Sequence, residues 1–158
     1  MGLDMYLSAQ KYISAHEHSA HKPLANAIIN MIGSDRDREA IFEHRTPSLN
    51  IEVTIGYWRK ANQIHNWFVQ SVQDGVDKCQ ESYVAREDLE GLEDVCSRVL
   101  QAQDEAVAME LLPPTEGFFF GDTSINEYYY QDLRDTIAIC DRALSMDPEW
   151  SFSYRSSW

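Results

Sequence analysis

Apolar residues recur at helical intervals of three or four in three segments of this chain. The three apolar stripes are Tyr57, Ala61, Ile64, Phe68 and Val72; Leu89, Leu92, Val95, Cys96, Val99 and Leu100; and Tyr129, Leu133, Ile137, Cys140 and Leu144. They predict helices over 57–73 and 86–101, and a final helix that a capping box at Ser124–Glu127 opens. Two shorter helices are expected over 23–32 and 104–111.

Shorter segments show the alternation of apolar and polar residues that is typical of β-strands with one buried face. The expected strands are 3–7, 11–14, 50–55, 82–84 and a C-terminal edge strand in which Trp150, Phe152 and Tyr154 alternate. Residues 34–39 are expected to form a charged turn, and residues 45–50 a loop. The sequence therefore predicts an α+β protein, mainly helical, with four or five helices and a small sheet built partly from the two chain ends. Its 158 residues suit a single domain over 1–158.

Acidic residues are concentrated in the second half of the chain. Residues 1–73 carry seven acidic and seven basic side chains, whereas residues 74–149 carry 19 acidic and five basic ones. Such a field repels nucleic acids and anionic membranes and attracts basic protein surfaces, so we expect neither direct nucleic-acid binding nor a membrane partner. The acids either keep the surface hydrated or imitate a nucleic-acid backbone. In the second case the partner-binding residues are Glu87, Asp88, Glu90, Glu93 and Asp94.

The cysteines and the absence of targeting patterns indicate a cytoplasmic protein. Cys79, Cys96 and Cys140 are odd in number and form no C-x-x-C pair, and the last two lie on helical apolar stripes. We therefore expect buried free thiols in a reducing compartment. No apolar run approaches membrane-spanning length, and the chain opens with no secretory leader pattern.

The segment 56–69 is the most distinctive candidate for a binding site, because it holds no acidic residue in a chain that carries 26 of them. On the predicted helix, an aromatic ring, an amide and an imidazole would share one strip, with a guanidinium beside it. This combination suits an anionic, nucleotide-like small molecule. The ligand-binding residues would be Trp58, Arg59, Asn62 and His65, with Asp4 and Tyr128 across the cleft. The other interpretation is that Trp58 and His65 lie at the core boundary and Arg59 pairs with an acid.

No motif for nucleophilic catalysis or for a cofactor is recognisable. The chain has no G-x-S-x-G or H-E-x-x-H pattern, and GFFFG (117–121) lacks the lysine of a phosphate-binding loop. His16, His18 and His21 lie close together, but no further ligand at a zinc-site spacing follows them, which favours a solvated loop. The sequence thus favours a binding protein over an enzyme, with neither cofactor nor metal expected, although its many carboxylates leave acid–base chemistry open.

Four blocks of the chain carry a resemblance to a family: MGLDMYL, GYWRKANQIHNWFVQSVQDGVDKCQESYVAREDLEGL, GFFFGDTSINEYYYQDL and SSW. They are similar to a small, uncharacterised family of proteins from phages and prophage-bearing bacterial genomes, over residues 1–15 and 51–158. The resemblance implies an accessory protein that acts by binding, such as a counter-defence inhibitor whose acidic half occupies a basic nucleic-acid-binding surface of a host protein. The chain departs from the family at Ala85, where a helix-capping serine is often found, and over 16–50.

Three functions are therefore open on the sequence alone. The chain is an acidic inhibitor, a protein that sequesters or processes an anionic small molecule, or a scaffold that self-associates through its aromatic C-terminus as a homo-oligomer. A concave pocket that joined Asp4 to the strip from Trp58 to His65 would favour the small-molecule function over the acidic inhibitor.

Overall fold

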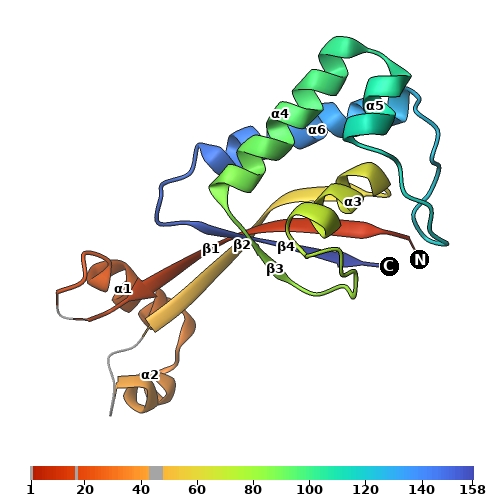
Figure 1. The fold of residues 1–158 in the computed structure, drawn as a ribbon. Helices are drawn as coiled ribbons and strands as arrows, with labels where there is room; N and C mark the ends of the chain where they lie inside the picture. The colour runs from red at the N-terminus through yellow and green to blue at the C-terminus, as the bar shows by residue number, and fades with distance from the viewer. Residues whose placement is uncertain (1, 17, 43–47) are drawn as a thin grey trace. The chain divides into compact units, whose positions relative to one another are not determined.

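Figure 1 shows the computed structural model of the protein, which describes residues 2–16, 18–42 and 48–158. Within these residues it is an α+β fold with six helices and a four-stranded antiparallel sheet, as the sequence predicts in outline. The helices are α1 (Lys22–Ile32), α2 (Asp35–Phe42), α3 (Asn62–Ser71), α4 (Arg86–Ala102), α5 (Glu105–Leu111) and α6 (Glu127–Leu144). The strands are β1 (Asp4–Ser14), β2 (Ser48–Arg59), β3 (Ser82–Val84) and β4 (Ser151–Ser157).

The chain divides into two compact units. Unit 1 comprises Met1–Ala9 and Val53–Trp158, and unit 2 comprises Gln10–Glu52, so β1 and β2 each contribute a part to both. Unit 2 has a small apolar cluster of its own, in which the buried Ile13, Ala15 and Ala25 pack against Leu49 and Ile51. Everything that positions the candidate site belongs to unit 1.

The two chain ends lie side by side in the sheet, whose strand order is β2-β1-β4-β3. This confirms the prediction that both ends contribute strands. The C-terminal strand is not the predicted edge strand, however, because β3 pairs with its other side, with Tyr83 opposite Ser153. Phe152 and Tyr154 are consequently buried on its inner face.

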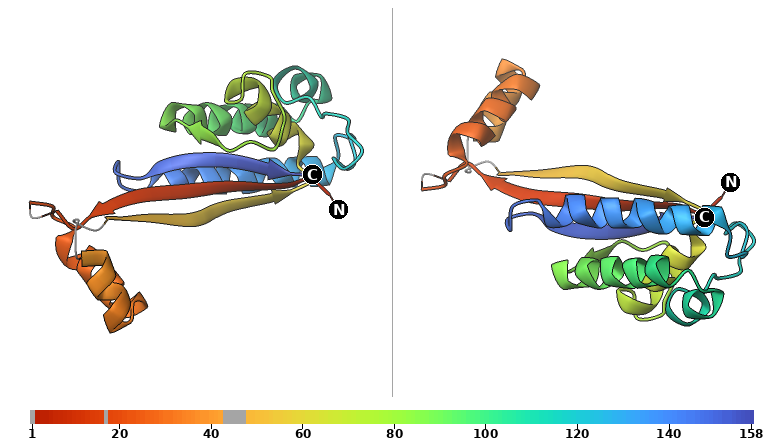
Figure 2. Two further views of the ribbon diagram at one scale, coloured as in Figure 1. Left: turned by 90° about the horizontal axis from the view of Figure 1, so that it is seen from below. Right: turned by 90° about the horizontal axis from the view of Figure 1, so that it is seen from above.

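The helices of unit 1 cover one face of the sheet. In Figure 2, α6 crosses in front of the strands when they are seen from above, and the strands stand in front of α6 when they are seen from below. The core between the two layers contains Leu3, then Met5 and Leu7 of β1, and predicted inward residues of α4 and α6. Those of the helices include Leu89, Leu92, Cys96, Val99, Tyr129, Leu133 and Cys140. Cys96 and Cys140 are buried free thiols, as predicted, and Cys79 is half-buried.

Three short segments differ from the prediction. The two expected strands 3–7 and 11–14 are one strand, β1, which begins at Asp4 and continues because residues 8–10 contain no glycine or proline that would end it. The charged turn expected over 34–39 is mostly helix α2, which a reciprocal cap stabilises: Ser34 donates from its backbone N–H to Asp37 Oδ2 (3.0 Å), and Asp37 N–H donates back to Ser34 Oγ (3.3 Å). Of the expected loop over 45–50, residues 45–47 lie outside the described residues and the rest belongs to β2.

The predicted helix over 57–73 begins five residues late, at Asn62, because β2 continues through Arg59. Gly56 and Trp58 face the helical layer, while Tyr57 and Arg59 point to the other side of the sheet and are exposed. Aromatic residues favour strands, and the same residues fit either period over so short a stretch. Lys60 ends the strand with a φ of 62°, in the left-handed region.

The cap of α6 differs from the prediction, whereas α4 begins at Ala85 without a capping side chain, as expected. The N-cap of α6 is Asn126, whose side chain accepts hydrogen bonds from the N–H groups of Tyr128 and Tyr129, so the proposed capping box at Ser124–Glu127 is wrong. At the start of α4, Asp88 Oδ2 accepts the N–H of Ala85 at 2.9 Å. Alanine cannot return the bond, so half of a capping box remains.

Replacement of Gly56 by alanine should destabilise the protein by about 1–3 kcal/mol, because its Cβ would lie 2.5 Å from Ile139 Cγ2 of α6 and 3.2 Å from Leu7 Cβ. Gly91→Ala is the matched control. A Cβ at Gly91, inside α4, meets only Trp67 at 4.0 Å, so this variant should be about 0.5–1 kcal/mol more stable than wild type. Urea unfolding of both variants measures the difference. Equal effects of the two substitutions would contradict the close packing of α6 on β2.

Candidate functional site

The residues of the predicted strip do not lie on one helix face. Trp58 belongs to β2 and is 4% exposed, and its indole Nε1 donates to Thr136 Oγ1 of α6 at 2.9 Å. Asn62 and His65 lie on α3 and are both 1% exposed. The prediction that Trp58, Asn62 and His65 share a helix face open to a ligand is therefore wrong. All three side chains are buried in the interior.

Asn62 fastens the loop before α6 to the start of α3. Its Nδ2 donates to the carbonyl oxygens of Phe120 (3.2 Å) and Asp122 (2.9 Å), and its Oδ1 accepts the N–H of Thr115 (3.0 Å). Three hydrogen bonds use nearly all that an amide side chain offers. Asn62 therefore holds residues 115–122 in place and has little capacity for a ligand.

His65 is part of a buried polar chain. Its Nδ1 lies 2.7 Å from the hydroxyl of Tyr154, and its Nε2 lies 3.0 Å from Asp77 Oδ2. The indole of Trp158 donates to the other oxygen of Asp77 at 3.2 Å. Burial raises the pKa of Tyr154 well above its ordinary value, so its hydroxyl stays protonated. This chain ties the C-terminus to α3 and leaves no ring nitrogen of His65 free.

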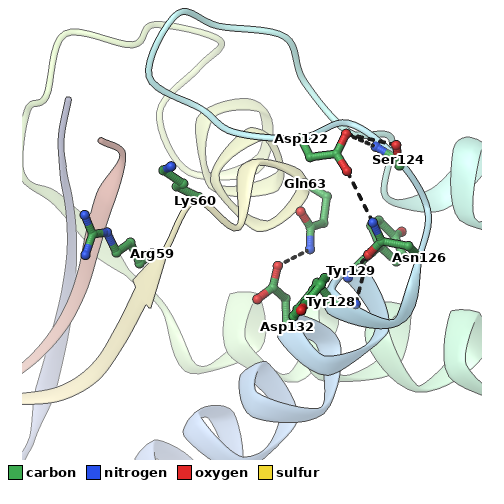
Figure 3. Close-up of a pocket in the computed structure, with 9 residues that line it drawn as sticks. All are labelled: Arg59, Lys60, Gln63, Asp122, Ser124, Asn126, Tyr128, Tyr129 and Asp132. Atoms are coloured by element: carbon green, nitrogen blue, oxygen red, sulfur yellow. Dashed lines mark hydrogen bonds between the residues drawn. The ribbon is translucent and has the colours of Figure 1, made fainter. Parts of the chain in front are cut away.

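A pocket of about 300 Å³ lies at the end of β2, between the start of α3 and the start of α6 (Figure 3). It is lined by Arg59, Lys60, Gln63, Asp122, Ser124, Asn126, Tyr128, Tyr129 and Asp132. The pocket thus contains Arg59 and Tyr128 of the predicted site, and the other lining residues were missed. Figure 3 shows the basic side chains on one side, with Arg59 directed away from the interior, and the carboxylates and amides opposite them.

The two carboxylates of the pocket have different surroundings. Burial raises the pKa of Asp132, although the hydrogen bond that Gln63 Nε2 donates to its Oδ2 at 3.0 Å acts in the opposite direction. Hydrogen bonds from the side chain and backbone of Ser124 lower the pKa of Asp122, which also accepts from Asn126. Asp122 is therefore committed to its own loop, whereas Asp132 retains accepting capacity toward the pocket.

Asp4 lies beside Arg59 on the sheet face, outside the pocket lining. Its Oδ1 accepts the hydroxyl of Tyr57 at 2.5 Å and lies 4.0 Å from Arg59 Nε. The hydrogen bond raises the pKa of Tyr57. The side chain of Arg59 is 64% exposed, so this ion pair is weak and leaves most of the guanidinium available.

Three of the five predicted partner-binding acids are exposed on α4. Glu87, Glu90 and Asp94 follow one another at spacings of three and four on one helix face, and Asp94 pairs with Arg98 at 3.7 Å. Asp88 caps the helix, and Glu93 is half-buried.

Burial, with a smaller contribution from Glu93, raises the pKa of the Cys140 thiol to about 12.

Among the described residues, no group of three or more His, Cys, Asp and Glu side chains is arranged to hold a metal ion. His18 N–H contacts His16 Nδ1 at 3.4 Å, and the centroids of the two rings lie 5.7 Å apart.

Among the described residues, no helix combines the length and the apolar character needed to cross a membrane. Comparison with protein-family models, curated proteins and solved structures finds no match.

The pocket residues that the sequence analysis missed carry two weak signals. Tyr128 and Asp132 are four residues apart and therefore share a face of α6, next to the buried Tyr129. Asp122 and Ser124 form the D-x-S pattern of a side-chain-stabilised turn. Neither signal predicts that the end of β2 lies opposite the first turn of α6.

The substitution Asp132→Asn should make the protein more stable at neutral pH. A carboxyl group whose folded-state pKa is raised favours folding only while it is protonated, and that contribution is lost as the pH rises through the raised pKa. The stability gain of the variant should therefore be absent near pH 3 and present at pH 7, as measured by urea unfolding. Asp135→Asn, at an exposed position of the same helix, removes the same charge as a control. A gain that is equal in both variants, or that shrinks as the pH rises, would contradict this assignment.

Proposed function

We propose that the pocket of unit 1 binds a small anionic molecule that also carries hydroxyl or amino groups, such as a nucleotide or a sugar phosphate, in the bacterial cytoplasm. The observation that carries the proposal is the division of chemistry within one pocket of about 300 Å³, with cations on one side and hydrogen-bond acceptors on the other. This volume is at the lower end of the range for ligand sites, so it suits a small metabolite.

The cations supply the anion-binding end. Lys60 and Arg59 are consecutive residues at the end of β2, and both are exposed. The aliphatic part of the Lys60 side chain packs against Gly121: a Cβ at position 121 would lie 3.1 Å from the Cβ of Lys60. This contact holds the base of the Lys60 side chain in place. Lys60 would hold a phosphate by charge-assisted hydrogen bonds, the stronger kind, while Arg59 adds positive charge at the rim of the pocket.

The opposite wall suits the donors of the ligand. Asp132 is partly buried and accepts one hydrogen bond from Gln63, which leaves further lone pairs for hydroxyl or amino groups. Burial raises the pKa of Asp132 and so disfavours its ionised form, and hydrogen bonds from a ligand would offset this cost. Tyr128 is 83% exposed and offers a ring face for stacking.

The pocket supports binding more than catalysis. The lining residues that the structure describes include no His or Cys, and the hydroxyl of Ser124 donates to Asp122 at 2.9 Å. The base beside this hydroxyl is Asp122, and hydrogen bonds from its own loop lower its pKa, which makes it a weak base for the activation of a nucleophile. Sequestration of a small molecule agrees with the accessory role that the phage-family resemblance implies.

Thermal unfolding with adenosine 5′-monophosphate, ribose 5-phosphate and uncharged adenosine tests the proposal. A ligand present at a hundred times its dissociation constant should stabilise the folded protein by about 2.7 kcal/mol. Lys60→Gln should weaken the binding of the phosphorylated ligands about tenfold or more, because a hydrogen bond between charged groups contributes about 1.5–3 kcal/mol. Lys78→Gln removes the same charge from an exposed position outside the pocket lining and should leave affinity unchanged. Absence of any stabilisation, or equal losses in both variants, would refute the proposal.

We also propose, as a second function, that the acidic face of α4 docks on a basic surface of a host protein. The supporting observation is that Glu87, Glu90 and Asp94 are exposed in one row, in a segment with 19 acidic and five basic residues. Association of this kind is steered by charge and weakens with salt.

A triple variant with Glu87→Gln, Glu90→Gln and Asp94→Asn tests this second function. Immobilised wild-type protein should retain bacterial proteins that added DNA displaces and that 0.5 M salt releases, whereas the triple variant should not retain them. Asp88 is left intact because its removal would unfasten the start of α4. Retention of the same proteins by the triple variant would exclude the acidic face as the contact.

A further inference from the structure

The sheet face of unit 1 opposite the helices carries aromatic and basic side chains. Tyr6 and Tyr57 lie on β1 and β2 with ring centroids 5.4 Å apart, and the guanidinium of Arg155 on β4 lies 5.6 Å from the ring of Tyr6. Tyr83 of β3 is the cross-strand partner of Ser153, which shares a face with Arg155 because alternate residues of a strand point the same way. Arg59 completes the set, beside Asp4.

These side chains are accessible as platforms. Tyr57 is 50% exposed and Tyr83 is 69% exposed, while Ser8 and Ser153 between them are small and nearly buried. Tyr57 and Tyr83 stand three strand positions apart, which corresponds to about 14 Å at the usual spacing of about 4.8 Å between strands. The face therefore presents separated ring surfaces with arginine between them, rather than the continuous apolar patch that a protein interface has at its centre.

The local charge of this face opposes that of the whole chain. Within the described strands of unit 1, the side chains on this face include one carboxylate, Asp4, and two arginines, Arg59 and Arg155. The acidic helices α4 and α6 lie on the opposite side of the sheet from these side chains. A ligand on the open face therefore contacts the side chains of this face directly, and the more distant acids are screened by salt where they are exposed to solvent.

We propose that this open sheet face binds a short segment of single-stranded nucleic acid, with bases stacked on Tyr57 and Tyr83 and phosphates held by Arg155 and Arg59. Stacking on aromatic side chains together with arginine contacts is the usual chemistry of such surfaces. The inference revises the expectation, drawn from the net charge of −13, that the chain makes no direct contact with nucleic acid. It shares Arg59 with the proposed pocket function, but its other residues, Tyr57, Tyr83 and Arg155, do not line the pocket.

Fluorescence anisotropy of labelled octamers of deoxythymidine and uridine, titrated with the full chain in 0.15 M salt, tests the inference. Wild-type protein should bind the single strands and not a labelled duplex of the same length. Tyr83→Ala and Arg155→Gln should each weaken binding fivefold or more. Phe118→Ala, which removes an exposed aromatic ring that belongs neither to the sheet nor to the pocket lining, should leave oligonucleotide binding unchanged.

The salt dependence gives a second readout. With two arginines on the phosphates, the logarithm of the affinity should fall with the logarithm of the salt concentration with a slope of about −1.4. Urea unfolding of each variant shows whether its fold is intact, and Tyr83→Phe, which keeps the ring, should restore binding. The inference is overturned if wild-type protein does not bind single strands at 100 μM protein, if duplex binds equally well, or if Tyr83→Ala and Phe118→Ala have equal effects. Binding of a protein by this face in the absence of oligonucleotide binding would also overturn it.

Discussion

Close packing of α6 on strand β2 is the constraint on which the rest of unit 1 depends. Gly56 lets Ile139 approach the strand, and two residues later Trp58 donates to Thr136 in the same helix. These contacts place the N-terminal turn of α6, with Tyr128 and Asp132, opposite the end of β2. A pocket forms there because the strand must stop where the helix begins, and the left-handed residue Lys60 turns the chain into α3.

Buried polar side chains then fix what surrounds the pocket. Asn62 holds the segment 115–122 by three hydrogen bonds, and His65 links Asp77 to Tyr154. Removal of one side chain from such a network leaves buried polar groups without a hydrogen-bond partner, because water does not reach them. The loss of these hydrogen bonds therefore lowers the free energy of unfolding more than the loss of exposed ones. The polar residues that look most functional in the sequence thus act in the interior, and in our proposal the exposed residues beside them bind the ligand.

The sequence is informative about the helices and the chain ends and less so about the site. The stripes of α4 and α6 predict their buried faces, since apolar spacing of three and four that continues over many residues is typical of helices alone. The segment from Tyr57 to Arg59 fits a strand as well as a helix, and only the contact of Gly56 with Ile139 decides between them. Arg59 and Tyr128 were predicted site residues that do line one pocket, whereas Gln63 and Asp132 were missed because their pairing joins segments 69 residues apart.

The exposed rim and wall of the pocket bind a ligand, in our proposal, while the neighbouring buried residues do not. Nitrogen-15 NMR of the labelled protein titrated with ribose 5-phosphate tests this distinction most directly. We expect the side-chain amide signals of Gln63 and Asn126 to move with the ligand and the indole signal of Trp58 to stay in place. Movement of the Trp58 indole and the Asn62 amide with no change at Gln63 and Asn126 would contradict the proposal.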